Sequence, residues 1–293
     1  MKAAPFDHHA PETVAEAAGL LAEHGDEAKV LAGGQSLLPM LAMRLTRFEH
    51  LVDVSRVPEM QGITTDGGLR IGASTPQAVA EHDPVVAASV PLVARAIPHI
   101  GHFQIRNRGT VGGSIAHADP ASELPAVALA LDAVLEAASA SGTREIAAAD
   151  FFEGTWSTTL AEDEILVGVR FPVWTGRQGA AVREVARRSG DFAIAGVAAA
   201  VELDGDERIT RAAVGLFGVA STPVRASATE AALVGCTVSE ATAALADAAR
   251  AGTDAFDGVD DLHATAAYRR RVATHLVQTA LTAAMKEASG GGA

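Results

Sequence analysis

The sequence contains almost no cysteine: its 293 residues include one, Cys236. No disulfide can therefore form within the chain. An iron–sulfur cluster held by this chain alone is also excluded, because such clusters need several thiolate ligands. Cys236 follows the apolar residues Leu233 and Val234, so we expect it to act as a small buried hydrophobic residue.

Positive charge and long apolar runs are scarce as well. The chain has 23 Lys and Arg against 36 Asp and Glu, and its formal net charge is -13. A nucleic-acid partner normally requires a basic patch, so we expect none. Every apolar run is interrupted well before the ~20 residues that a membrane-spanning helix needs, and the N-terminus lacks the apolar stretch of a secretory signal. These absences predict a cytoplasmic protein without a transmembrane segment, with peripheral attachment to the inner face of the membrane as the alternative.

The residues that are present fit a folded α+β protein. Hydrophobic residues make up 48% of the chain and charged residues 20%, which suits one large or two ordinary domains. We assign residues 1–176 to a first domain that is subdivided near residue 57. Residues 177–288 form a smaller second domain with an antiparallel sheet and helices. The glycine-rich tail 289–293 is expected to be disordered.

Local patterns predict the elements of both domains. In the first domain the predicted helices are 13–23, 37–44, 75–81 (capped by Thr75), 85–97 and 121–131, and the strands are 29–31, 51–54, 63–65, 69–71, 133–137 and 164–171. In the second domain the predicted strands are 182–186, 194–203 and 212–219, followed by helices 227–234, 239–251 and 267–286.

Two glycine-rich segments are the most informative part of the sequence. The first reads Ala-Gly-Gly-Gln-Ser-Leu-Leu-Pro at 32–39, and the second reads Ile-Arg-Asn-Arg-Gly-Thr-Val-Gly-Gly-Ser-Ile-Ala at 105–116. Each is predicted to offer consecutive backbone N–H groups with little side chain in the way, as a diphosphate requires. Either segment alone is as readily a tight turn, but the pair favours a dinucleotide-like cofactor held from two sides.

Neither segment carries one of the two commonest phosphate-binding motifs. A P-loop needs Gly-Lys-Ser/Thr, and a Rossmann fingerprint needs Gly-x-Gly-x-x-Gly; both are missing here. What remains is a two-loop clamp in which the hydroxyls of Ser36, Thr110 and Ser114 are available to phosphate oxygens.

Both segments, together with Arg-Ser-Gly-Asp-Phe-Ala-Ile-Ala-Gly at 188–196, resemble a known family. The chain is similar to the FAD-binding (medium, flavoprotein) subunits of molybdenum-containing hydroxylases, most of all those of aerobic carbon monoxide dehydrogenases. The resemblance covers essentially the whole chain. It implies a two-part FAD-binding domain of the PCMH type, followed by the α+β domain.

The resemblance also implies which residues surround the FAD. They are Ala32, Gly33, Gly34, Gln35, Ser36 and Leu37 in the first segment, Thr110, Val111, Gly112, Gly113 and Ser114 in the second, and Asp119, Glu123, Leu166, Asp191 and Phe192. Arg106 is expected to brace the second segment rather than to touch FAD. Gln35 stands where relatives that tether FAD covalently often have His or Cys, so we expect non-covalent FAD.

The implied function is electron transfer within a larger complex. A partner subunit with the molybdenum cofactor oxidises the substrate, and electrons pass through 2Fe–2S clusters in a small subunit to this FAD and then to a quinone, NAD or oxygen. The implied assembly is a dimer of heterotrimers, with no catalytic residue for the substrate in this chain. The alternatives are the FAD subunit of a xanthine, aldehyde or aromatic-heterocycle hydroxylase, a free-standing FAD oxidoreductase, or an assembly subunit that has lost FAD.

Two other groups of residues, three histidines and three arginines, are candidates for a site. His99, His102 and His117 lack carboxylates at metal spacing, so no metal site is expected among them. The run 269–271 of three arginines is interpreted as solvated or partner-facing charge.

Overall fold

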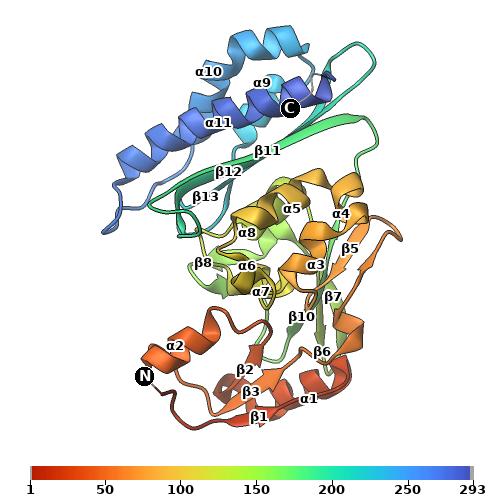
Figure 1. Ribbon diagram of the computed structural model, residues 1–293, viewed down its shortest axis with the longest axis vertical. Helices are drawn as coiled ribbons and strands as arrows, with labels where there is room; N and C mark the ends of the chain where they lie inside the picture. The colour runs from red at the N-terminus through yellow and green to blue at the C-terminus, as the bar shows by residue number, and fades with distance from the viewer. Residues whose placement is uncertain (1, 291–293) are drawn as a thin grey trace.

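The computed structural model describes residues 2–290, which form three sheet-containing units along the long axis of the molecule (Figure 1). The N-terminal unit has a three-stranded parallel sheet in the order β1–β3–β2. Its elements are β1 (Asp7–His9), α1 (Val14–His24), η1 (Gly25–Glu27), β2 (Ala28–Leu31), α2 (Leu37–Met43) and β3 (His50–Asp53).

The helix α1 illustrates how the sequence determines this unit. The Thr13 hydroxyl accepts the Glu16 N–H at 3.1 Å and caps the first turn. Ala17 and Leu21, one turn apart, are buried against the sheet, and Gly25 ends the helix with a φ of 51°. The prediction of a helix over 13–23 is confirmed.

The middle unit contains a five-stranded antiparallel sheet in the order β4–β5–β10–β6–β7. Its elements are η2 (Pro58–Met60), β4 (Ile63–Thr64), β5 (Leu69–Gly72), α3 (Gln77–His82), α4 (Pro84–Ser89), α5 (Pro91–Ala96), η3 (Ile97–His99), α6 (Phe103–Arg106), α7 (Val111–His117), α8 (Glu123–Ala130), β6 (Val134–Ser139), β7 (Gly142–Ala147), η4 (Ala148–Asp150), β8 (Phe152–Gly154), β9 (Ser157–Thr158) and β10 (Ile165–Phe171).

The C-terminal unit is a four-stranded antiparallel sheet in sequential order with helices on one face (Figure 1). Its elements are β11 (Arg177–Ala186), β12 (Ala193–Leu203), β13 (Ile209–Phe217), β14 (Val224–Arg225), α9 (Ser227–Leu233), α10 (Val238–Asp254) and α11 (Ala266–Ala288). Helix α11 packs on one face of the sheet and α8 of the middle unit on the other. Close approach needs glycine on both faces, because a Cβ on Gly179 would lie 2.0 Å from the Ala284 carbonyl oxygen and one on Gly215 would lie 2.3 Å from that of Ala126.

Most predicted elements are found within a few residues of their expected ends, and the α+β class is confirmed. The predicted helix over 85–97 is wrong: it is two helices, α4 and α5, because Pro91 cannot donate to the preceding turn. Thr75 is not the cap of α3, since its hydroxyl donates to the Gly62 carbonyl at 3.2 Å and Pro76 occupies the N-cap position. Cys236 is half-buried at the edge of the C-terminal core rather than fully buried.

The middle and C-terminal units are joined by a half-exposed ion pair. The Arg95 guanidinium on α5 makes two hydrogen bonds to the Glu287 carboxylate on α11 and a third to the Ala180 carbonyl on β11. The Ala180 N–H also donates to Glu287 at 3.1 Å. Hydrogen bonding to Arg95 lowers the pKa of Glu287, while partial burial opposes that effect. This arrangement connects both units through charge-assisted hydrogen bonds.

Arg269 corrects the interpretation of the arginines 269–271 as solvated or partner-facing charge. It is 3% exposed and donates to the carbonyls of Ile194 at 2.5 Å and Gly218 at 2.6 Å. Its second terminal nitrogen lies 2.6 Å from a carboxylate oxygen of Asp261. Arg269 therefore holds the start of α11 on the sheet.

Two further predictions concern the membrane and the tail. Over residues 2–290, no helix combines the length and apolar character needed to cross a membrane. The N–H groups of Ser289 and Gly290 donate to the Met285 and Glu287 carbonyls at the end of α11. The rest of the predicted tail, 291–293, lies outside the described residues.

Candidate functional site

The two glycine-rich segments lie against each other. The first connects β2 to α2, and the second runs from the end of α6 into α7 (Figure 1). A Cβ atom on Gly33 would lie 2.2 Å from the Arg108 carbonyl oxygen and 2.6 Å from the Gly109 Cα. One on Gly113 would lie 3.3 Å from the Ala32 Cβ. The two main chains are therefore in contact, and residue 33 must be glycine to allow it.

The first segment presents a run of unpaired main-chain donors. Gly34 has a φ of 71°, which turns the chain into α2. Within residues 2–290, the N–H groups of 33–37 have no protein acceptor, and Ser36 at the N-cap position makes no capping bond. The Gln35 carboxamide donates to the Gly33 carbonyl at 2.9 Å and stabilises the loop. Unpaired N–H groups at a helix start carry partial positive charge, which favours an anion such as phosphate.

The second segment is not the open loop that the sequence predicts. Val111–His117 form helix α7, and Thr110 caps it. The first four N–H groups of α7 donate to acceptors inside the protein at 2.9–3.1 Å. Val111 donates to the Thr75 carbonyl and Gly112 to the Ala73 carbonyl. Gly113 donates to the hydroxyl of Thr110, and Ser114 donates to its carbonyl. The expectation of free main-chain donors in this segment is therefore wrong.

Gly112 and Gly113 serve packing rather than an open cradle. A Cβ on Gly112 would lie 2.3 Å from the Ala73 Cβ, so this glycine lets α7 pack on the segment after β5. What the second segment can still offer a ligand is the surface at Gly113 and the hydroxyl of Ser114. Neither the Ser36 nor the Ser114 hydroxyl has a hydrogen-bond partner among the described residues, and both side chains are half-buried.

Asp119 lies just beyond α7 and is fixed by two hydrogen bonds. Its carboxylate accepts the Ala121 N–H at 2.9 Å and the Trp156 indole N–H at 3.1 Å. The Trp156 ring stacks on His117 with centroids 6.2 Å apart. Burial lowers the pKa of His117, although the nearby Asp119 charge raises it. His117 and Asp119 are half-buried and Trp156 is 58% exposed, and together they form an aromatic and acidic surface beside α7.

Glu123 begins α8 and is 7% exposed. Burial raises the pKa of Glu123 to about 8, and the neighbouring carboxylates of Glu184 and Asp119 add to the increase. Its carboxyl group is therefore largely protonated at neutral pH. Glu184 in β11 has one buried oxygen without a partner, and its other oxygen lies 3.3 Å from His99 Nδ1.

The remaining predicted residues come from β10 and from the β11–β12 hairpin. Leu166 is buried in β10, where the ladder with β6 shifts register. Phe192 is 67% exposed on the hairpin, and Asp191 lies 3.4 Å from Arg188. A Cβ on Gly190 would lie 2.6 Å from the His102 ring, so the hairpin touches the chain just before the second segment.

Two side chains hold the second segment in place. Arg106 makes a two-point ion pair with Glu81 at 2.7 and 3.1 Å and donates to nearby carbonyls, which confirms its predicted bracing role. The second residue, Gln77, was not predicted from the sequence. Its side chain donates to the Thr110 carbonyl at 3.4 Å, and its main-chain N–H donates to the Gly109 carbonyl at 2.8 Å. The buried Oε1 atom of Gln77 has no hydrogen-bond partner among the described residues. Its position near a predicted helix start was the signal available in the sequence, whereas its burial is seen only in the structure.

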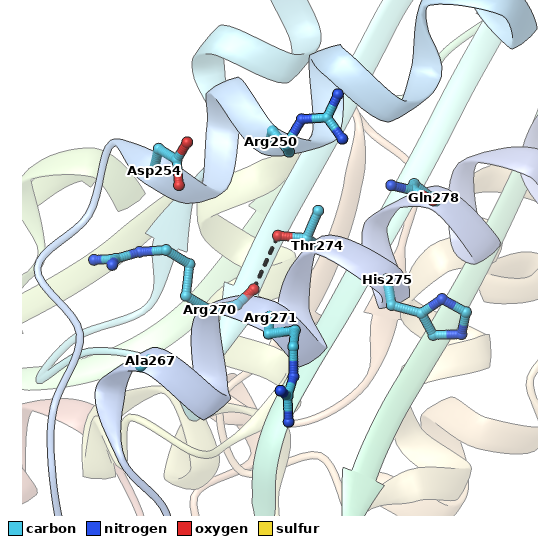
Figure 2. Close-up of a pocket in the computed structure, with 8 residues that line it drawn as sticks. All are labelled: Arg250, Asp254, Ala267, Arg270, Arg271, Thr274, His275 and Gln278. Carbon is cyan, nitrogen blue, oxygen red and sulfur yellow. Dashed lines mark hydrogen bonds between the residues drawn. The ribbon is translucent and has the colours of Figure 1, made fainter.

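A hollow also lies elsewhere among residues 2–290, between two helices of the C-terminal unit. Figure 2 shows it between α10 and α11, with a volume of about 500 Å³. It is lined by Arg250, Asp254, Ala267, Arg270, Arg271, Thr274, His275 and Gln278. Arg270 is already used to cap the end of α10, donating to the Thr253 carbonyl at 3.2 Å and the Phe256 carbonyl at 3.0 Å. The hollow is shallow and has no contact with the glycine segments, which remain the candidate site.

Comparison with known protein families identifies the family of this chain. Residues 4–174 match the "FAD binding domain in molybdopterin dehydrogenase", and residues 180–284 match the "CO dehydrogenase flavoprotein C-terminal domain". The chain belongs to this FAD-binding family. The predicted cofactor is thus confirmed as FAD at the level of the family, and the predicted resemblance is confirmed as well.

Individual relatives match the FAD-binding chain over nearly its full length. It is 39% identical to the 6-hydroxypseudooxynicotine dehydrogenase complex subunit alpha of Paenarthrobacter nicotinovorans, covering 98% of this chain and 97% of the relative. It is also 39% identical to the carbon monoxide dehydrogenase medium chain of Hydrogenophaga pseudoflava, covering 95% and 96%. A solved structure of carbon monoxide dehydrogenase from that organism matches with a TM-score of 0.93 at 38% identity, covering 98% of this chain and 99% of the other. The chain is therefore an oxidoreductase subunit of the molybdenum hydroxylase family.

Proposed function

We propose that this chain holds FAD at the two glycine segments and transfers electrons within a molybdenum, iron–sulfur and flavin hydroxylase complex. The observation that carries the proposal is the contact at Gly33, beside a run of unpaired N–H groups over 33–37. Such a run fits a diphosphate, and membership of the family identifies the nucleotide. FAD, when bound, supplies the chemistry of accepting electrons and passing them on.

In this proposal the first segment makes most of the contacts to the FAD diphosphate. The residues Ala32, Gly33, Gly34, Gln35, Ser36 and Leu37 surround the diphosphate, with N–H groups as donors. From the second segment, the Ser114 hydroxyl donates and Gly113 leaves space, while the buried residues Thr110, Val111 and Gly112 shape the wall from behind. The Gln35 side chain is a carboxamide and offers no nucleophile for a covalent link, so FAD is held non-covalently.

Other predicted contacts complete the proposed site. Asp119 and Glu123 lie on the acidic side beyond α7, and the protonated Glu123 places no negative charge beside the cofactor at neutral pH. Leu166 provides an apolar surface from β10. Asp191 and Phe192 on the hairpin approach the flavin ring. No residue of this chain is assigned to bond-making at the substrate.

The proposal for the partners is supported by relatives that are named as subunits or chains of larger enzymes. We infer a large subunit with the molybdenum cofactor and a small subunit with 2Fe–2S clusters, because one cysteine cannot ligate a cluster in this chain. A dimer of heterotrimers, a quinone as the acceptor, and a cytoplasmic location that can be peripheral to the inner membrane face belong to the same proposal.

Carbon monoxide is the proposed substrate of the complex. The equal identity to a 6-hydroxypseudooxynicotine dehydrogenase subunit favours one alternative, an N-heterocycle or related hydroxylase. Substrate choice resides in the molybdenum subunit, so both readings assign the same role to this chain.

Anaerobic titration of the natively purified complex tests the proposal. Carbon monoxide should bleach the flavin band near ~450 nm, whereas a purine, an aldehyde and an N-heterocycle should not. Bleaching by one of these compounds instead would support the electron-transfer role but would identify that compound, not carbon monoxide, as the substrate. If the native chain runs alone on gel filtration and turns over a small substrate, the subunit proposal is wrong.

A further inference from the structure

Three histidines meet where β1 and α1 end and β3 begins, away from the glycine segments. His9 ends β1, His24 ends α1 and His50 begins β3. One ring nitrogen from each lies within 4.8 Å of the other two, and all three side chains are half-buried. The His9 Nε2 and His50 Nδ1 atoms are 3.1 Å apart.

The sheet register separates this cluster from the cofactor site. His50 pairs with Ala28 at the start of β2, whereas the first glycine segment follows Leu31 at its end. Three residues of strand correspond to about 10 Å. The cluster is therefore no part of the FAD site, and nothing in the proposed function uses it.

The surroundings of the cluster supply a further oxygen donor. The Asp7 carboxylate lies 3.9 Å from His50 Nδ1, and its side chain is 80% exposed, so it is free to move. The neighbouring His8 points to the other face of β1, where it bonds Asp53 at 3.2 Å. His8 therefore has its own carboxylate partner on one face of β1, whereas His9 lies with His24 and His50 on the other face.

We propose that His9, His24 and His50 bind one divalent transition-metal ion of the zinc class, with Asp7 or water as the fourth ligand. Imidazole nitrogens suit Zn²⁺ and Cu²⁺. Zinc–nitrogen bonds of about 2.0–2.1 Å in a tetrahedron place two ligand atoms roughly 3.3 Å apart. The 3.1 Å between His9 and His50 is close to that edge.

One ring must turn for the ion to bind. The His24 and His50 rings are stacked, with centroids 3.7 Å apart and an angle of 12° between planes. Two parallel rings cannot direct in-plane lone pairs at one ion. Rotation of the half-buried His24 ring about its Cβ–Cγ bond removes this obstacle, and the ion then links β1, α1 and β3 in place of the stack.

Zinc titration of the full chain tests the proposal. The protein carries no affinity-tag histidines and is first treated with a chelator. Calorimetry should find one tight Zn²⁺ site in the wild type, and affinity should fall more than about tenfold in His24→Ala and in His9→Ala. The matched control His8→Ala should bind zinc as the wild type does. A wild type that binds no zinc, or a control that loses as much affinity as His24→Ala, would overturn the proposal.

A second experiment does not require the alanine variants to fold. Electron paramagnetic resonance of the Cu²⁺-loaded wild type should show superhyperfine splitting from several imidazole nitrogens. His24→Gln should lose part of this splitting while retaining FAD, which reports an intact fold at the opposite end of the sheet. Oxygen-only coordination in the wild type, or a spectrum unchanged in His24→Gln, would refute the site.

Discussion

The substitution Gly33→Ala would force apart the two segments that hold the cofactor. The new Cβ would lie 2.2 Å from the Arg108 carbonyl oxygen and 2.6 Å from the Gly109 Cα. Backbone atoms must therefore move by about 1 Å, because interiors are close-packed and contacts below ~3 Å do not occur. Overpacking of this kind costs about 1–3 kcal/mol. Since the strain lies in the contact between the segments, we expect FAD affinity to fall roughly 10–100-fold.

Titration of the deflavinated protein with FAD measures this effect. The matched control is Gly19→Ala in α1, where a Cβ would meet no atom within 4 Å and removal of a helical glycine stabilises by about 1 kcal/mol. The control should bind FAD as the wild type does. Folded Gly33→Ala protein that binds FAD within about twofold of the wild type would refute the placement of the cofactor.

Three further substitutions separate packing and titration effects. Gly112→Ala should destabilise the fold by about 1–3 kcal/mol in urea denaturation, with or without FAD, because its Cβ would lie 2.3 Å from the Ala73 Cβ; unchanged stability would contradict this. Because Arg95 lowers the pKa of Glu287, Glu287→Gln should be less stable than the wild type at pH 7. This difference in stability should vanish as pH falls below 4.5 and through the lowered pKa of Glu287. A stability difference that does not depend on pH would contradict the pairing. Because burial raises the pKa of Glu123 to about 8, the wild type should lose stability as pH rises from 4.5 through 8, and Glu123→Gln should flatten that part of the curve; parallel curves would contradict the burial argument.

Local sequence signals were sufficient for the elements with local causes. The predicted strands 63–65 and 69–71 flank Gly67 and Gly68, whose φ values of 67° and 132° allow the turn between β4 and β5. The strand and the helix on either side of the first glycine segment are also confirmed, because a strand, two glycines and a helix start occur in order along the chain.

Features set by distant residues could not be predicted from the sequence. Helix α7 contains Gly112 and Gly113, which disfavour a helix locally, and it forms because Thr110 caps it and Ala73 accepts a hydrogen bond from it. Arg269 is charged and lies among other arginines, yet its carbonyl partners lie in β12 and just after β13, far earlier in the chain. The histidine cluster likewise gathers residues from three separate elements.

The flavin content of the natively purified chain tests the central claim most directly. Acid precipitation followed by quantification should release about one FAD per chain into the supernatant. The precipitated polypeptide should be colourless, because Gln35 offers no covalent attachment. A chain purified without flavin, or one whose flavin stays with the precipitate, would contradict a non-covalent FAD held between the two glycine segments.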